Sequence, residues 1–154
     1  MSTPSPGPMA IEGADMLIGA LLRVPSQTIH RRIIRELNAA GFKELRVPHM
    51  AVLQFPGPNG ARPSVLAERA GVSKQAMNQL LRSLEGCGYI SRFDAPNAGG
   101  ARTVHFTAHG EAAYSKIYDI LRDIEREWRS ELGQKDFARL KNLLLRVCSS
   151  RLVS

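Results

Sequence analysis

The stretch SVLAERAGVSKQAMNQLLRSLEGCGYISR, residues 64–92, contains two helical patterns separated by a tight turn. Ser64 is placed to cap the first helix, and Gly71 stands where a helix ends in a left-handed residue. Ser73 is placed to cap the second, longer helix, which ends at one of the glycines that flank Cys87. A short helix, a three-residue turn and a longer helix predict a helix-turn-helix motif.

The longer helix of this motif has two distinct faces. At about 100° per residue, residues 74–82 separate into an apolar face and a face with two cations and three amides, and this span contains no acidic residue. The polar face consists of Lys74, Gln75, Asn78, Gln79 and Arg82. Amide side chains can bind adenine, arginine can bind guanine, and Ser73 with the first backbone amides is suited to phosphate oxygens. This face is typical of a helix that reads the DNA major groove, and a solvated amphipathic helix is the alternative.

A β-hairpin is predicted directly after the helix-turn-helix. Residues 89–93, YISRF, and residues 102–107, RTVHFT, have the composition of short strands, with Val104 and Phe106 on one face. The connecting glycines lack the Gly-Lys-Ser/Thr signature of a phosphate-binding loop, so they serve the turn. The residues between these two strands therefore form the tip of a β-hairpin.

Long helices are predicted on either side of this unit. One covers most of Met16–Ala40, with Pro25 expected to kink or divide it. Thr107 is placed to cap a helix over about residues 109–132, and a last helix runs from Asp136 to about Ser150. The apolar stripes of these helices exceed what the small central unit can cover, so we expect them to pack against a second copy of the chain.

The expected fold class is mainly α-helical with a small β-hairpin wing. The expected organisation is a disordered arm (1–15), an N-terminal dimerisation helix (16–47), a winged helix-turn-helix region (48–108) and C-terminal dimerisation helices (109–154). The whole chain has 154 residues, 44% of them hydrophobic, and a formal net charge of +7. This length supports one compact unit. The positive charge favours a polyanionic partner such as DNA, although many basic proteins bind no nucleic acid.

The two cysteines, Cys87 and Cys148, fit neither a zinc-ligand spacing nor a disulfide framework. A reducing, cytoplasmic environment is therefore expected. The first residues lack a basic segment, and the apolar run 16–22 is too short to cross a bilayer, so we expect no membrane partner. Cys87 is interpreted as a small buried hydrophobic residue at a helix end, and redox sensing at the DNA-binding surface is the alternative.

Catalytic patterns are not evident in the sequence. His105 and His109 are four residues apart, but a strand end and a helix start separate them, so ordinary surface histidines are favoured over a shared metal. The acidic residues of DILRDIEREWRSE, residues 119–131, alternate with arginines and predict ion pairs within one helix. We therefore expect a protein that is not an enzyme and that uses neither a metal nor a cofactor.

Three motifs in this order resemble those of the MarR family of transcriptional regulators, over about residues 16–152. They are Leu-Ala-x-x-x-Gly at 66–71, Leu-Glu-x-x-Gly-Tyr at 84–89 and Phe-Thr-x-x-Gly at 106–110. The resemblance implies a winged helix-turn-helix on each protomer and a homodimer built from the first and last two helices. It also implies that this dimer is a repressor or regulator that binds a pseudo-palindromic operator in double-stranded DNA.

The resemblance also assigns residues to the DNA contact. Ser73, Lys74, Gln75, Asn78 and Gln79 match the DNA-facing positions of the recognition helix, and Arg82 lies on the same side. The family's wing tip usually bears an Asp-x-Arg whose arginine enters the minor groove.

Ala98 and Gly100 occupy those two positions in this chain, which leaves Arg92 and Arg102 as the hairpin arginines. The missing tip arginine keeps open a second function, in which a winged-helix dimer acts through protein contacts with weak or no DNA binding.

A small anionic or phenolic effector is a further implication of the resemblance. In the family it occupies the cleft between the dimerisation and winged regions, where this sequence offers Arg31, Arg32 and Arg46. A charged, solvated helix face is the alternative for each of these three residues.

Overall fold

The computed structural model describes residues 16–55, 59–94 and 102–150. Its elements, in chain order, are α1 (Ile18–Ala39), η2 (Val47–His49), α2 (Met50–Leu53), α3 (Pro63–Ala70), α4 (Lys74–Gly86), β1 (Ile90–Asp94), β2 (Arg102–Phe106), α5 (Ala108–Leu132) and α6 (Gln134–Cys148). The helical fold with one antiparallel hairpin confirms the predicted fold class. None of the helices in the described part of the chain has the length and apolar character needed to cross a bilayer.

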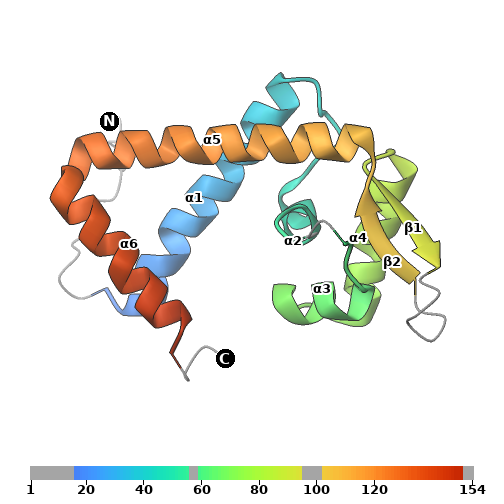
Figure 1. The fold of residues 1–154 in the computed structure, drawn as a ribbon, viewed down its shortest axis with the longest axis horizontal. Helices are drawn as coiled ribbons and strands as arrows, with labels where there is room; N and C mark the ends of the chain where they lie inside the picture. Colours follow the sequence, from blue (N-terminus) through green and yellow to red (C-terminus); the bar gives the residue numbers. More distant parts are fainter. Residues whose placement is uncertain (1–15, 56–58, 95–101, 151–154) are drawn as a thin grey trace, which may run out of the picture.

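Helix α5 forms the long spine of the molecule (Figure 1). The hairpin and helices α2 to α4 lie at its first end, and α6 folds back from its other end, where the first half of α1 also lies (Figure 1). Buried apolar side chains from both regions form one continuous core, including Ile33 and Leu37 of α1, Leu81 of α4 and Ile120 of α5. The helix-turn-helix is therefore held against the α1–α5 pair.

Local signals define the helix ends of the central unit. Ser73 Oγ accepts a hydrogen bond from the backbone N–H of Ala76 at 3.1 Å, so the predicted cap of α4 is confirmed. Gly71 ends α3 with φ +64°, a left-handed conformation in which glycine is favoured. The prediction that Ser64 caps α3 is wrong, because Pro63 already occupies the first helical turn and the cap position belongs to Arg62. Proline favours this position, where its missing N–H costs no hydrogen bond.

Thr107 caps α5, as predicted, and the structure explains why the Phe-Thr-x-x-Gly motif ends in a glycine, Gly110. The Thr107 Oγ1 accepts a hydrogen bond from Gly110 N–H at 3.1 Å. A Cβ built on Gly110 would collide with the backbone carbonyl oxygen of Tyr89. The motif therefore allows the start of α5 to approach the backbone at the base of the wing.

Tyr89 joins the base of the wing to the rest of the molecule. Its ring is fully buried and stacks on His109, with the ring centroids 4.4 Å apart. Its hydroxyl donates a hydrogen bond to Glu44 Oε2 at 2.9 Å. Burial, together with the neighbouring carboxylate, raises the pKa of Tyr89, so the phenol stays protonated at neutral pH.

Helix α1 is a single element that runs through Pro25, so of the two expected effects of this proline, a kink or a division, the division does not occur. Proline removes one backbone hydrogen bond, and a helix of this length tolerates that loss when packing holds its other half. The C-terminal half of α1 supplies this packing through Ile33, Ile34 and Leu37. Arg32 adds a bidentate ion pair to Glu127 of α5, with Nη–Oε distances of 2.5 and 2.8 Å.

The wing is a two-stranded antiparallel hairpin in which Ile90 pairs with Phe106 and Arg92 pairs with Val104. A short bridge from Ala61 to Val104 ties it to the segment before α3. The predicted N-terminal arm, residues 1–15, lies outside the described residues, as do Ala98 and Gly100 at the wing tip.

Candidate nucleic-acid interface

Helix α4 presents its polar face to solvent because its apolar face is anchored in the core. Met77, Leu81 and Leu84 are buried beneath α4, and the Ser73 cap fixes the first turn. An amphipathic helix anchored in this way keeps its opposite side chains accessible. The cap also leaves the positive end of the helix dipole near the exposed Lys74.

The structure brings six of the predicted site residues together on α4 and its cap. Ser73, Lys74, Gln75, Gln79 and Arg82 are exposed, and Asn78 is half-buried. Within the described residues, neither Lys74 nor Arg82 forms an ion pair with an acidic side chain. Their charge is therefore available to a ligand rather than neutralised within the chain.

The two predicted wing arginines lie in different environments. The Arg102 side chain is 64% exposed, and its Nε donates to Asp94 Oδ1 at 3.1 Å. The Arg92 side chain is only 15% exposed and lies on the hairpin face that carries the buried Val104, with Nε 3.2 Å from Glu85 Oε2 of α4. Arg102 is accessible to an external partner, whereas Arg92 packs the wing against the end of α4.

A cavity of about 350 Å³ lies behind the recognition helix. Its lining comes from α1, the η2–α2 segment and the residues after it, α3, the turn before α4 and the middle of α4. It consists of His30, Val47, Pro48, Met50, Ala51, Gln54, Phe55, Arg69, Ala70, Val72 and Leu80. The lining is mostly apolar, with the Arg69 guanidinium as its cation and a 3.0 Å contact between His30 Nε2 and Gln54 Nε2. This composition matches a small ligand that combines an apolar body with an acidic group.

Sequence reasoning had suggested other arginines for an effector. Arg32 is engaged by Glu36 and Glu127, and neither Arg31 nor Arg46 lines the cavity. Arg69 was missed because it stands on the exposed side of a short helix, with no local pattern to distinguish it. Only its position beside α1 and α2 in the folded chain indicates a ligand-facing role.

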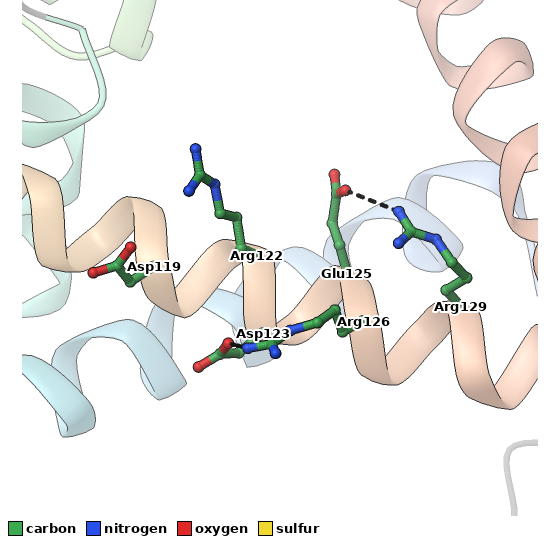
Figure 2. Close-up of a pocket in the computed structure, with 6 residues that line it drawn as sticks. All are labelled: Asp119, Arg122, Asp123, Glu125, Arg126 and Arg129. Carbon is green, nitrogen blue, oxygen red and sulfur yellow. Dashed lines mark hydrogen bonds and ion pairs between the residues drawn. The ribbon is translucent and has the colours of Figure 1, made fainter.

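A surface hollow of about 500 Å³ lies along α5 and is lined by charged side chains alone (Figure 2). Glu125 pairs with Arg129, and Asp123 pairs with Arg126 (Figure 2), so the predicted ion pairs within the helix are confirmed. Glu125 also binds Lys141 of α6 at 2.8 Å. These pairs neutralise one another and mark a solvated helix face rather than acid–base machinery.

The described part of the chain contains no metal-binding cluster of three or more His, Cys, Asp or Glu side chains. His105 contacts Phe93 and Thr103 on the wing, whereas His109 stacks on Tyr89. The interpretation of Cys87 as a buried residue is wrong, because this thiol is exposed. Cys87 follows the last turn of α4, where the chain turns outward before the wing.

The fold and the site define a winged helix-turn-helix protein whose helix α4 has an exposed face of basic and amide side chains. Residues 45–102 match the MarR family model. The chain is 28% identical over 133 residues to the HTH-type transcriptional repressor Rv2887 of Mycobacterium tuberculosis, covering 82% of this chain and 91% of that protein. It is also 41% identical over 61 residues to the DNA-binding transcriptional repressor YiaJ of Escherichia coli, covering 39% of this chain and 21% of the length of YiaJ.

Solved structures show the same fold. The MarR-family protein Rv2887 in complex with salicylic acid superimposes with a TM-score of 0.65 at 24% identity, covering 87% of this chain and 98% of that one. NadR in complex with 4-hydroxyphenylacetate gives a TM-score of 0.69 at 20% identity, covering 92% and 99% of the two chains. Residues 45–102 are therefore similar to the MarR family, and the relatives named here are transcriptional repressors.

Proposed function

We propose that the protein is a DNA-binding transcriptional repressor that acts as a homodimer on a pseudo-palindromic operator. The observation that supports this most strongly is the exposed face of α4, where Lys74 and Arg82 flank three amide side chains and neither cation is ion-paired within the described residues. In a dimer, the two copies of α4 enter major-groove half-sites about one helical turn, or a multiple of it, apart. Phosphate contacts add affinity that decreases with salt.

The test is selection of bound sequences from random duplexes, followed by gel shift with the selected operator. Wild-type protein is expected to shift it with an affinity that falls steeply with salt, and the double variant Lys74→Ala, Arg82→Ala is expected to abolish the shift. The matched control is Lys43→Ala, Arg122→Ala, which removes the same charge from exposed positions outside α4 and α6. Binding that survives the α4 variant would contradict this assignment of the recognition helix. Failure to select any duplex would favour the protein-contact function.

We further propose that a small aromatic acid in the cavity behind α4 modulates DNA binding. Rv2887 and NadR, which share the fold, have been crystallised with a salicylate and a hydroxyphenylacetate. The apolar lining around Arg69 supports a ligand of the same class. A carboxylate that pairs with the guanidinium gains a charge-assisted hydrogen bond in a partly desolvated site. Binding would act by shifting the population of orientations that α4 adopts.

Calorimetric titration of the free protein with salicylate tests this second proposal. Arg69→Ala is expected to weaken binding about tenfold, the loss expected for about 1.4 kcal/mol of charge-assisted bonding. Arg62→Ala is the matched control, because Arg62 is an exposed arginine at the start of the same helix but lies outside the cavity lining. Equal salicylate affinity in the wild type and Arg69→Ala would exclude Arg69 as the binding group.

A further inference from the structure

The η2–α2 segment contributes side chains both to the cavity wall and to the contact with α4. Val47, Pro48, Met50 and Ala51 line the cavity. His49, in the middle of this run, is absent from the lining, is only 7% exposed and turns toward α4. Among the described residues, His49 is the one buried polar side chain, and the core around it is apolar.

Two hydrogen bonds determine the state of the His49 ring. Its Nδ1 accepts a bond from the backbone N–H of Arg46 at 3.0 Å, so Nδ1 carries no proton. The neutral ring then has its hydrogen on Nε2, which donates to Ser83 Oγ of α4 at 3.1 Å. Among the side-chain hydrogen bonds of the described residues, this one alone joins the η2–α2 segment to the recognition helix.

The electrostatic surroundings favour this neutral ring. Burial first, and the nearby Arg46 cation second, lower the pKa of His49 below its ordinary value. Arg46 is the charged group that acts on the ring, whereas α4 presents the uncharged Ser83 hydroxyl. The neutral ring therefore donates its Nε2 hydrogen to the Ser83 hydroxyl oxygen.

We propose that His49 is a positioning residue that ties the recognition helix to the cavity wall. The His49–Ser83 bond fixes the orientation of α4 relative to the η2–α2 segment, and this orientation sets the half-site spacing that the dimer accepts. A ligand that moves the cavity wall then moves α4 through the same bond. This inference rests on the proposed DNA-binding function and adds to it the residue that transmits the change.

The test compares the selected operator with the same operator carrying one extra base pair between its half-sites. A merely structural role for His49 would lower stability but would leave the ratio of the two affinities unchanged. Ser83→Ala removes the acceptor at an exposed helix position that lies outside the DNA-facing set, so the fold is expected to persist. Ser83→Thr keeps the hydroxyl and is the matched control, and His49→Asn removes the bond from the other side.

Wild type and Ser83→Thr are expected to prefer the selected spacing to the same degree. Ser83→Ala and His49→Asn are each expected to reduce that preference about fivefold, the size expected for the net contribution of one hydrogen bond. Their combination is expected to be no worse than either alone, because both remove the same bond. If Ser83→Ala preferred the selected spacing as strongly as the wild type does, the proposed role of His49 would be overturned. If the wild-type protein bound no operator in the gel shift, the DNA-binding function itself would be overturned.

Discussion

Gly110 is the residue that allows α5 to pack closely against the base of the wing. It lies buried in the first turn of α5, and a side chain there would meet the Tyr89 carbonyl oxygen and the Phe106 ring. We predict that Gly110→Ala lowers the free energy of unfolding by about 2 kcal/mol or more, because backbone atoms cannot move aside as a flexible side chain can. Urea denaturation monitored by circular dichroism measures the change.

Gly86 provides the matched control for this prediction. It is also helical, but a Cβ added to it would meet no heavy atom within 4 Å. Gly86→Ala is therefore expected to leave stability unchanged or to raise it by up to about 1 kcal/mol through helix propensity. If the two variants were equally stable, the close packing of α5 against the base of the wing would be wrong.

At the scale of elements, we expect the two arginines of the wing to have different roles: Arg102 contacts DNA and Arg92 stabilises the fold. We predict that Arg102→Ala weakens operator binding and reduces the salt slope by about one, as expected when one phosphate contact is lost. The exposed position of Arg102 beside Asp94 supports this prediction. Gel shifts at several salt concentrations measure both quantities.

Arg92→Ala is the comparison variant on the same hairpin. Its side chain is covered and faces Glu85, so we predict a loss of about 1 kcal/mol in stability through lost packing, with little change in DNA affinity. Operator binding that is weakened by Arg92→Ala and unaffected by Arg102→Ala would reverse this assignment.

The elements themselves were largely predictable from the sequence, because their signals are local. Ser73 and Thr107 cap the helices that they precede, and the apolar spacing of α4 placed its buried and exposed faces correctly. Ser64 failed as a predicted cap because Pro63, one position earlier, is the stronger start signal. The burial of Cys87 was also wrong, since burial at a helix end depends on where the next segment turns.

The parts of the site that depend on distant segments were not predictable. Arg32 is held by Glu127, which is 95 positions away in the chain, so sequence alone left it free for an effector. The Arg69 cavity and the His49–Ser83 bond likewise require α1, α2 and α4 to be placed in space. Residue type and spacing indicate which face of one helix is functional, but not which side chains from several helices meet.

At the scale of the whole molecule, apolar surface is concentrated at the end opposite the wing. Leu17 of the chain before α1 is 82% exposed, and Leu145 of α6 is 61% exposed, with Ile18, Leu143 and Val147 also exposed nearby in sequence. Between α1, α5 and α6 lies an apolar cavity of about 350 Å³. An exposed apolar surface of this kind favours burial against another protein surface, and the homodimer proposed above would supply it.

We predict that the wild-type chain, whose mass is 16.9 kDa, has twice that mass in solution by light scattering. Leu143→Asp with Leu145→Asp is expected to give the single-chain mass, because carboxylates at these exposed apolar positions cannot be buried without partners. Phe93→Asp is the matched control, since it places a charge on an exposed apolar position of the wing. The monomeric variant is expected to lose most of its operator affinity, because it engages only one half-site at a time. A variant that stays dimeric, or a wild type that is monomeric at micromolar concentration, would show that α6 does not form the interface.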